Sequence, residues 1–458
     1  MLQISNLTYS INSKIVLSGV NLALGAHDRL ALIGDNGTGK TTLLKLITGE
    51  LKPDFGTITN KGFVAYVPQH TEDDALSGGQ VTQREIKRAI YQPNAPSLLL
   101  LDEPTNNLDT KAREWLEQVV QCFDGPVILA SHDRAFMDKV ATHVAEIKDG
   151  KLEVFKGGYS AYSVVQEWRQ AEQQAEYDKQ QTAKNKLLTQ LHAAKNTANR
   201  ANHARYDKTK VADMKMSFNS RVDNAKATAG KQVHAAASKL DQLSDIEKPR
   251  ERKTYGAYLS SDIKHDKNLV LVQNVTKSFG EHQVLGGVSF SINTGGRVHV
   301  VGGNGSGKST LLKIVAGLVK PDSGVVKLAD GLKFGYVSQS VTGIDAHCTG
   351  LDNLLKDTPD KAAIYQAAST MDITPADLDK PASQLSRGQI TKLAIMRLLF
   401  QSLDLIILDE PTNHIDIRAR ENIEGALSGY QGALLLASHD QYFVKQLGIT
   451  DTMNILLG

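Results

Sequence analysis

The chain has 458 residues, with 52 Lys or Arg against 50 Asp or Glu, for a net charge of +2. At roughly 150 residues per domain, this length predicts about three units, and no apolar run approaches the ~20 residues that a membrane-spanning helix needs. The two distant cysteines, Cys122 and Cys348, exclude a disulfide framework and match no metal or Fe–S pattern.

The first predicted elements are a strand, a glycine-rich loop and a helix. A strand-like pattern begins at Leu2, with no charged and apolar leader before it. An apolar run at 30–33 precedes GDNGTGKT at 34–41, and a helical pattern follows at 42–47. Glycines let such a loop turn tightly and point its N–H groups at phosphate oxygens, and the next helix N-terminus attracts anions. We therefore predict a phosphate-binding loop that comprises Gly34, Asn36, Gly37, Gly39, Lys40, Thr41 and Thr42.

Two carboxylates are predicted at the end of a later buried strand. The sequence LLLLDEP occupies 98–104, and four consecutive apolar residues before Asp102 indicate a strand that is buried on both faces. In a phosphate-loop protein, Lys40 reaches the β- and γ-phosphates, while Thr41 and Asp102 hold Mg²⁺. The adjacent Glu103 is then placed to orient or deprotonate an attacking water.

A basic insert with a helical pattern follows the first set of motifs. Pro is absent from 127–248 and Gly from 159–229, and small or apolar residues recur at spacings of four and three. This pattern predicts two antiparallel helices, about 160–204 and 216–247, that pair as a coiled coil. The alternative is a disordered segment. Between Lys184 and Lys239 there are twelve Lys or Arg and three Asp, which favours a polyanionic partner over an ordinary solvated helix face.

The motifs of the first part recur after the insert in the same order. GGNGSGKS occupies 302–309 after an apolar run, and LIILDEP occupies 405–411. A repeat of this length predicts two nucleotide sites that act together. The residues of the second set are Gly302, Asn304, Gly305, Gly307, Lys308, Ser309, Thr310, Asp409 and Glu410.

Further motifs in both copies resemble the ATP-binding-cassette superfamily. They are LSGGQ at 76–80, LSRGQ at 385–389, and Ser-His-Asp at 131–133 and 438–440. The resemblance implies an α/β fold in which two cassettes face each other and enclose two ATP molecules. It also implies that His132 and His439 act with the two glutamates in catalysis, and that Gln69 and Gln339 join the Mg²⁺ ligands. The implied signature contacts to the opposite ATP are Ser77, Gly78, Gly79, Gln80, Ser386, Gly388 and Gln389.

Two details qualify this resemblance. Tyr9 and Phe279 lie upstream of the loops and resemble the aromatic residue that stacks on adenine, although ordinary core packing is the alternative. Arg387 replaces the usual signature Gly, so we expect the two ATP sites to be unequal.

The spacing of the motifs argues against a transporter motor. Gln69 precedes Ser77 by 8 residues, whereas Gln339 precedes Ser386 by 47. The missing segment corresponds to the helical subdomain that couples transporter cassettes to their membrane partner. A chromosome or DNA-repair ATPase is a second alternative, but its coiled coil leaves from within a cassette. A binding module with inactive ATP sites is a third, and Glu103 and Glu410 speak against it.

Two cassettes joined by a basic helical hairpin resemble the ABC-F family. The residues Tyr159 to Tyr162, at the start of the insert, are similar to that family's inter-cassette linker. The expected domains are a first cassette with a shortened helical subdomain (1–158), a linker (159–262) and a second cassette (263–458). The resemblance implies a cytoplasmic, monomeric ATPase that uses ATP and Mg²⁺ and needs no obligate protein partner. Its implied partner is the ribosome, with the linker near the P-site tRNA and the peptidyl-transferase centre, in antibiotic protection or as a housekeeping translation factor.

Overall fold

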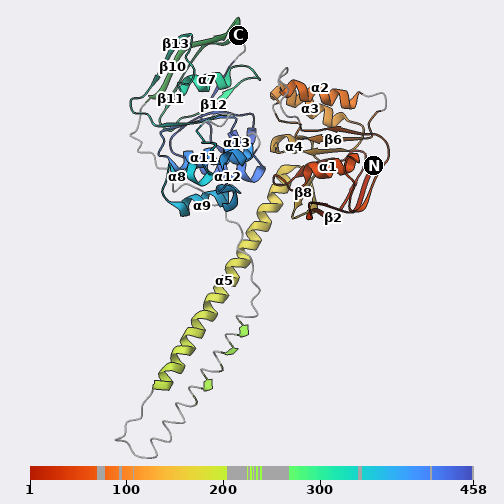
Figure 1. Cartoon of the computed structure of the whole chain (residues 1–458), viewed down its shortest axis with the longest axis vertical. Coiled ribbons are helices and arrows are strands. Elements are labelled where there is room, and N and C mark those ends of the chain that lie inside the picture. The colour runs from red at the N-terminus through yellow and green to blue at the C-terminus, as the bar shows by residue number, and fades with distance from the viewer. Residues whose placement is uncertain are drawn as a thin grey trace, which may run out of the picture. The chain divides into compact units, whose positions relative to one another are not determined.

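The computed structural model describes residues 1–69, 78–91, 95–106, 108–203, 268–338, 343–412 and 415–455, with isolated positions between 224 and 239. It divides into two compact units, one formed by Met1–Tyr162 with Arg252–Gly458 and the other by Ser163–Glu251. The first unit contains two α/β cassettes, which Figure 1 shows at the two ends of the colour scale. In the described part of the chain, no helix is long and apolar enough to span a membrane.

The first cassette is built on a six-stranded sheet with the order β5-β6-β7-β3-β8-β9. The strands from β5 to β8 in this order are parallel, and β9 pairs with β8 in the antiparallel sense. A smaller antiparallel sheet, β2-β1-β4, packs with it around a shared apolar core. The strands are β1 (Leu2–Ile11), β2 (Lys14–Leu24), β3 (Arg29–Ile33), β4 (Phe55–Asn60), β5 (Val64–Val67), β6 (Leu98–Asp102), β7 (Val127–Ala130), β8 (His143–Lys148) and β9 (Lys151–Lys156). The helices are α1 (Lys40–Thr48), α2 (Gly78–Ile90), α3 (Thr110–Cys122) and α4 (Arg134–Val140).

The second cassette repeats this plan with a five-stranded parallel sheet, β14-β15-β16-β12-β17, and a smaller antiparallel sheet, β11-β10-β13. The strands are β10 (Asn268–Phe279), β11 (His282–Asn293), β12 (Arg297–Val301), β13 (Ser323–Leu328), β14 (Phe334–Val337), β15 (Leu405–Asp409), β16 (Ala433–Ala437) and β17 (Asp451–Asn454). The helices are α7 (Lys308–Val315), α8 (Gly350–Leu355), α9 (Lys361–Thr370), α10 (Pro375–Leu378), α11 (Arg387–Phe400), α12 (Ile417–Ser428) and α13 (Gln441–Gln446), with a 3₁₀ turn at Ala382–Gln384.

The predicted elements around both phosphate loops are confirmed. The apolar runs before the loops form β3 and β12, and the helical patterns after them form α1 and α7. The apolar runs before Asp102 and Asp409 form β6 and β15, in which all five residues are buried. Parallel strands buried on both faces are expected to be apolar throughout, which explains why these two runs lack the alternation of a surface strand.

The cassettes differ between the strand that follows the small sheet and the signature helix. In the second cassette, α8, α9 and α10 occupy this segment, and their apolar side chains join one core with α11 and α12. In the first cassette, β5 ends at Val67 and α2 begins at Gly78, with 70–77 outside the described residues. The described elements of the two cassettes therefore differ here, and a shortened helical subdomain in the first cassette stays a prediction.

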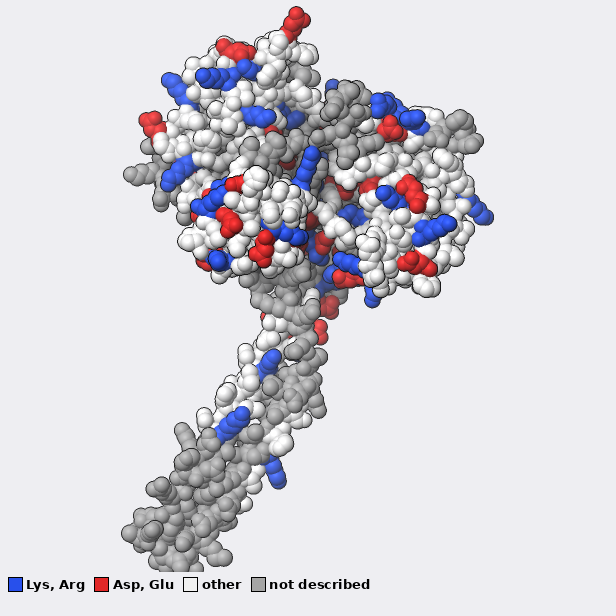
Figure 2. Space-filling model, in the orientation of Figure 1, with Lys and Arg blue, Asp and Glu red and all other residues white. Residues whose placement is uncertain are grey.

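The first arm of the predicted hairpin is confirmed by one 45-residue helix, α5 (Tyr159–His203), which Figure 1 shows as a long continuous ribbon. The predicted turn and most of the second arm lie outside the described residues. Charges along α5 are segregated: Glu167, Glu172, Glu176 and Asp178 lie in its first half, and no acidic residue follows up to His203. Figure 2 shows Lys and Arg side chains along the later part of the described helix.

The first turn of α5 is bonded to residues of both cassettes. Ser160 donates from its backbone N–H to Asp138 Oδ1 (2.6 Å), and its hydroxyl lies 2.7 Å from the Tyr442 hydroxyl, which donates to Asp138 Oδ2. Tyr159 is buried and its hydroxyl donates to Glu421 on α12 over 2.9 Å. These contacts, here called the linker anchor, join the start of the helix to α4, α12 and α13.

Candidate ATP sites

The backbone of each glycine-rich loop adopts the left-handed conformation that glycine permits. Gly39 has a φ of 104° and Gly307 a φ of 93°, and each is the N-cap of the following helix. A Cβ at Gly39 would lie 2.7 Å from Val16 Cγ1, and one at Gly307 would lie 2.6 Å from Val284 Cγ1. Side chains are therefore excluded here by both conformation and space, so the loop amides remain free to approach a phosphate.

The loop lysines fold over their own loops. Lys40 Nζ donates to the carbonyl oxygens of Gly34 (2.7 Å) and Asp35 (3.0 Å), and Lys308 Nζ makes the same two bonds to Gly302 (2.8 Å) and Gly303 (3.0 Å). Burial lowers the pKa of both lysines. The equivalent bonds in two copies place each ammonium at the mouth of its loop, where it fits a phosphate.

The predicted Mg²⁺ ligands come together in both cassettes. Thr41 Oγ1 donates to Asp102 Oδ2 over 2.7 Å, and Ser309 Oγ donates to Asp409 Oδ1 over 3.0 Å. Burial raises the pKa of both aspartates, which a nearby cation would reverse. A hydroxyl and a carboxylate beside a phosphate loop are the oxygen ligands that Mg²⁺ uses together with substrate phosphates.

Two tyrosines that the sequence analysis did not select also face these aspartates. The Tyr66 hydroxyl donates to Asp102 Oδ2 over 3.5 Å, and the Tyr336 hydroxyl donates to Asp409 Oδ2 over 3.4 Å. Both tyrosines lie three residues before the predicted glutamines, Gln69 and Gln339. This equal offset in the two copies is the signal that could have identified them.

Both predicted catalytic glutamates have a strained backbone and a buried carboxylate. Glu103 and Glu410 each have a φ of 50°, in the left-handed region that non-glycine residues rarely occupy. Burial raises the pKa of both to about 7. The Oε1 atoms of both are buried and have no hydrogen-bond partner among the described residues. Such orphaned acceptors fit a site that completes its hydrogen bonds with a substrate or a water.

A histidine from the Ser-His-Asp segment lies beside each glutamate. His132 Nε2 is 3.4 Å from Glu103 Oε1, and its backbone N–H donates to Glu103 Oε2 over 3.4 Å. His439 repeats both contacts with Glu410, at 3.5 Å and 3.3 Å. Burial lowers the pKa of both histidines, that of His439 to about 4, so both imidazoles are neutral at pH 7.

Residues of each cassette also reach the site of the other, and the sequence analysis missed them. Arg420 Nη1 donates to the His132 carbonyl oxygen over 3.0 Å, and Arg113 Nη1 donates to the His439 carbonyl oxygen over 3.4 Å. Arg418 Nη1 bonds Asp35 Oδ2, in the first phosphate loop, over 3.1 Å. Arg113 and Arg420 each lie four residues after the aspartate that caps their helix. This equal spacing in the two copies is the signal that could have identified them.

The signature residues are only partly described. Ser386 caps α11 and forms a capping box with Gln389, and Gly388 is buried in the first turn. Gly78, Gly79 and Gln80 begin α2, whereas Ser77 and Gln339 lie outside the described residues. Gln69, Asn36 and Asn304 are exposed, and Thr42 and Thr310 are half-buried in the first turns of α1 and α7. Contacts of the signatures with the opposite loops remain predictions.

The two predicted adenine-stacking residues do not occupy equivalent positions. In the first cassette, Tyr9 pairs with Leu17. Leu285 is the equivalent of Leu17 in the second cassette and pairs with Lys277, so the counterpart of Tyr9 is Lys277. Phe279 pairs with His282, which makes Ile11 its counterpart. Phe279 is 55% exposed, with Lys277 Nζ 5.5 Å from the centre of its ring, whereas Tyr9 packs against the core. Tyr9 and Phe279 are therefore separate candidates for adenine stacking, and Phe279 fits this role better because its ring is accessible.

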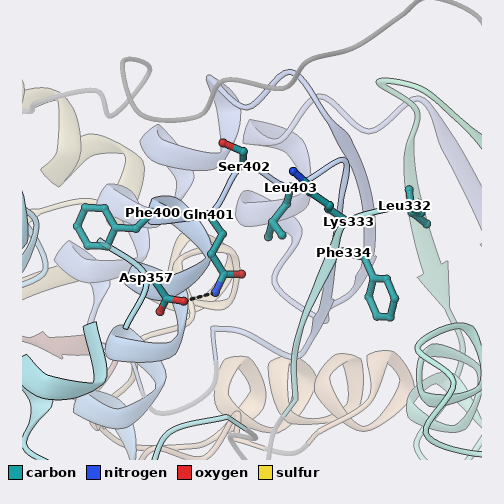
Figure 3. Close-up of a pocket in the computed structure, with 8 residues that line it drawn as sticks. All are labelled: Leu332, Lys333, Phe334, Asp357, Phe400, Gln401, Ser402 and Leu403. Atoms are coloured by element: carbon teal, nitrogen blue, oxygen red, sulfur yellow. Dashed lines mark hydrogen bonds between the residues drawn. The ribbon is translucent and has the colours of Figure 1, made fainter. Parts of the chain in front are cut away.

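A pocket of about 530 Å³ in the second cassette involves none of these residues. Figure 3 shows its lining, which includes Gln401 donating to Asp357. The pocket therefore adds nothing to the description of the ATP sites.

Comparison with known families covers part of each cassette and the start of the linker. A family described as "ABC transporter" matches residues 17–71 and 285–413, which include both phosphate loops. An extension family with the same description matches residues 145–223, which include the end of the first cassette and the whole of α5.

Curated relatives extend over most of the chain. It is 32% identical to "Ribosome protection protein VmlR" of Bacillus subtilis over 97% of this chain and 84% of the relative. It is 30% identical to "Erythromycin resistance ATP-binding protein MsrA" of Staphylococcus epidermidis over 92% and 90%. It is also 32% identical to "Energy-dependent translational throttle protein EttA" of Mycobacterium tuberculosis over 81% and 62%.

The fold resembles that of solved proteins with two cassettes. One is the archaeal ribosome recycling factor aABCE1 in its complex with the stalk protein aP1, with a TM-score of 0.64 and 18% identity over 98% of this chain and 87% of that chain. Another is described as "RNase-L Inhibitor", with a TM-score of 0.64 and 16% identity over 99% and 87%.

Proposed function

The chain belongs to the ABC-F family of ATP-hydrolysing proteins, and we propose that it binds the ribosome through its basic helical linker while both ATP sites are filled. In this proposal the linker comprises residues 159–262 and lies near the P-site tRNA and the peptidyl-transferase centre. ATP hydrolysis then releases the protein.

The charge distribution of α5 is the observation that carries the proposal. From Lys179 to His203 the helix has basic residues and no acidic ones, while its first half is acidic. Lys179, Lys186 and Lys195 are exposed along this part of the helix. Phosphate backbones attract such a surface without reading a sequence, and acidic residues would repel them from the first half. The far part of the linker therefore suits RNA, and the part next to the cassettes does not.

The ATP sites can control this binding because they connect the two cassettes. Arg418 bonds Asp35 and Arg420 bonds the His132 backbone, so the first ATP site includes groups from the second cassette. The linker anchor depends on Asp138 from one cassette and on Tyr442 and Glu421 from the other. Separation of the cassettes would break both arginine bonds and the bonds that Tyr442 and Glu421 make in the linker anchor. A ligand that holds the cassettes together thus also fixes the base of the linker.

The chemistry follows from the residues of each site. Lys40 and Lys308, with the loop amides, would bind the phosphates, and Thr41, Asp102, Ser309 and Asp409 would hold Mg²⁺. Mg²⁺ neutralises charge that develops on the phosphate oxygens. With a pKa near 7, Glu103 and Glu410 are each poised to take a proton from the attacking water. The backbone N–H groups of His132 and His439 hold the two carboxylates in place.

Protection of ribosomes from antibiotics is the more specific role that we favour. Two relatives that align over more than 80% of their own length carry names that state ribosome protection or erythromycin resistance. The alternative, a housekeeping translation factor, is supported by the relative named for translational throttling. Expression of the chain in a drug-sensitive host separates the two, because only protection raises the inhibitory concentration of ribosome-targeting drugs.

Co-sedimentation with purified ribosomes tests the ribosome proposal. The Glu103→Gln/Glu410→Gln variant keeps its phosphate-binding residues but loses both candidate bases, so it should pellet with ribosomes in ATP and not in ADP. Equal pelleting in both nucleotides, or none, would contradict the ATP-dependent switch.

A charge variant tests whether the linker makes the contact. In the same background, Lys179, Lys186 and Lys195 are changed to Gln, and the matched control changes the exposed Lys14, Lys52 and Lys61 of the first cassette. The linker variant should reduce the slope of log affinity against log salt by up to ~0.9 per lost phosphate contact, and the control should not. Equal slopes for the two variants would reject the linker as the RNA-binding element.

A further inference from the structure

In each cassette, one arginine side chain donates a hydrogen bond to a histidine carbonyl oxygen of the other cassette. Arg420 on α12 and Arg113 on α3 are both 7% exposed, and each reaches the carbonyl oxygen of the opposite Ser-His-Asp histidine. Each also bonds the aspartate of its own Ser-His-Asp segment, Asp440 at 3.2 Å and Asp133 at 2.8 Å. The same two-ended contact thus occurs twice in the molecule.

The histidine that accepts this bond also holds the catalytic glutamate. In the first site the carbonyl of His132 accepts from Arg420, while the N–H of His132 donates to Glu103 Oε2 and its Nε2 lies 3.4 Å from Glu103 Oε1. A movement of the guanidinium would therefore shift the residue that orients Glu103. Arg420 itself is fixed from its own side, because its Nε donates to the Ile415 carbonyl over 2.9 Å.

From this geometry we infer that Arg420 and Arg113 are positioning residues that act across the cassettes. Arg420 sets the His132–Glu103 geometry of the first ATP site, and Arg113 sets the His439–Glu410 geometry of the second. Neither arginine bonds an atom of the catalytic glutamates; each acts through a histidine backbone.

The two arginines should not contribute equally. The bond from Arg420 to His132 is 3.0 Å, whereas that from Arg113 to His439 is 3.4 Å. Arg113 Nε has no hydrogen-bond partner among the described residues, whereas Arg420 Nε is bonded. Because the bond across the cassettes is shorter for Arg420, the first site should depend more on Arg420 than the second site depends on Arg113.

Single-site backgrounds make this inference testable in the full chain. Glu410→Gln leaves the Glu103 site as the hydrolytic one, and Glu103→Gln leaves the Glu410 site. Lysine keeps the charge of arginine but lacks the planar fork that bonds two acceptors, so Arg420→Lys and Arg113→Lys remove the two-ended contact. The readout is steady-state ATP hydrolysis by the purified protein without ribosomes, so the outcome does not depend on the proposed partner.

The expected result is a crossed pattern. In the Glu410→Gln background, Arg420→Lys should lower kcat about tenfold, because a hydrogen bond to a charged group contributes about this much. In the Glu103→Gln background, the same change should lower kcat by less than about twofold. Arg113→Lys should show the reverse pattern with a smaller loss. The KM for ATP should stay within about twofold, because neither arginine contacts the phosphate loops.

Two controls separate positioning from general interface stability. Glu424→Gln breaks the buried ion pair with Arg134, which also crosses the cassettes but does not involve a histidine carbonyl. Arg134 keeps its 3.8 Å contact with Asp440 in this variant. Glu424→Gln should lower both backgrounds equally. Lys111→Met removes an exposed charge on α3 and should change neither. If either arginine variant unfolds in a thermal melt, the other tests the same pattern. Equal losses in both backgrounds, or no loss, would overturn the inference.

Discussion

The two cassettes share their catalytic geometry but differ in how it is enclosed. The bond from threonine or serine to aspartate, the left-handed glutamate and the glutamate–histidine contact recur with nearly equal distances. The surroundings are less equal: the His132 side chain is 10% exposed and that of His439 is 28% exposed. The chemistry of a site is thus set by local sequence, whereas its isolation from water depends on contacts with the other cassette.

The ion pairs between the two cassettes are also unequal. Arg134, the first residue of α4, forms a buried ion pair with Glu424 of the second cassette. The counterpart of Arg134 on α13 is Gln441, and Glu117, the counterpart of Glu424, bonds Lys139 in its own cassette instead. One side of the interface therefore has a charged cross-cassette pair that the other side lacks. Each of the following predictions tests how far this asymmetry reaches.

The largest effect is expected from the catalytic glutamates. Changing both Glu103 and Glu410 to Gln should lower ATP hydrolysis by at least about 100-fold, because general-base catalysis is worth that much. Among the single variants, Glu103→Gln should lose the larger share, since its site is better enclosed. Phosphate release at saturating ATP measures both. Equal losses from the two single variants would show that enclosure does not govern turnover.

The buried ion pair should contribute the next largest effect. Glu424→Gln removes the nearest charge partner of the buried Arg134 guanidinium and leaves it only the 3.8 Å contact with Asp440. This loss should lower the free energy of unfolding by about 3 kcal/mol. Glu117→Gln is the matched change, and it should cost less because its nearer partner, Lys139, is 50% exposed. Its second partner, Arg113, lies 3.7 Å away and keeps its own bond to Asp133. Urea unfolding followed by circular dichroism compares Glu424→Gln with Glu117→Gln. Similar midpoints for the two variants would contradict an asymmetric interface.

The smallest effect is expected where the cassettes are most alike. Tyr66→Phe and Tyr336→Phe each remove one long hydrogen bond to the aspartate of a predicted Mg²⁺ site. Each should raise the KM for Mg-ATP by no more than about fivefold, because bonds of 3.4–3.5 Å are weak. The two changes should agree within about twofold when measured in the single-site backgrounds. A much larger effect of one tyrosine would extend the asymmetry to the metal ligands.

Local patterns predicted most of the fold and the centre of each site. The apolar runs before Asp102 and Asp409, the glycine loops and the long breaker-free insert each correspond to an element of the structure. These signals work because strand burial, left-handed glycine and helix continuity are properties of a few neighbouring residues.

Contacts between distant residues could not be predicted in the same way. Arg420 and His132 are 288 positions apart. The equal spacing after an N-cap aspartate marks Arg420 and Arg113, but it does not indicate which residue either arginine contacts. The φ of 50° at Glu103 and Glu410 was also not anticipated, because glutamate has no preference for that conformation and the surrounding sheet imposes it. The aromatic residues are a different case, because Tyr9 precedes Gly34 by 25 residues and Phe279 precedes Gly302 by 23. This difference already indicates that they are not counterparts, and strand pairing shows it.

The linker anchor has a consequence for the order in which the protein matures during synthesis. Ser160 and Tyr442 are bonded but lie 282 positions apart. At a translation rate of about 5–20 residues per second, about 14–56 s pass between the addition of these two residues. During that time the first cassette can fold around its own sheet, but the base of α5 lacks its second point of attachment. The first phosphate loop of a nascent chain can therefore form well before the base of α5 is attached to the second cassette.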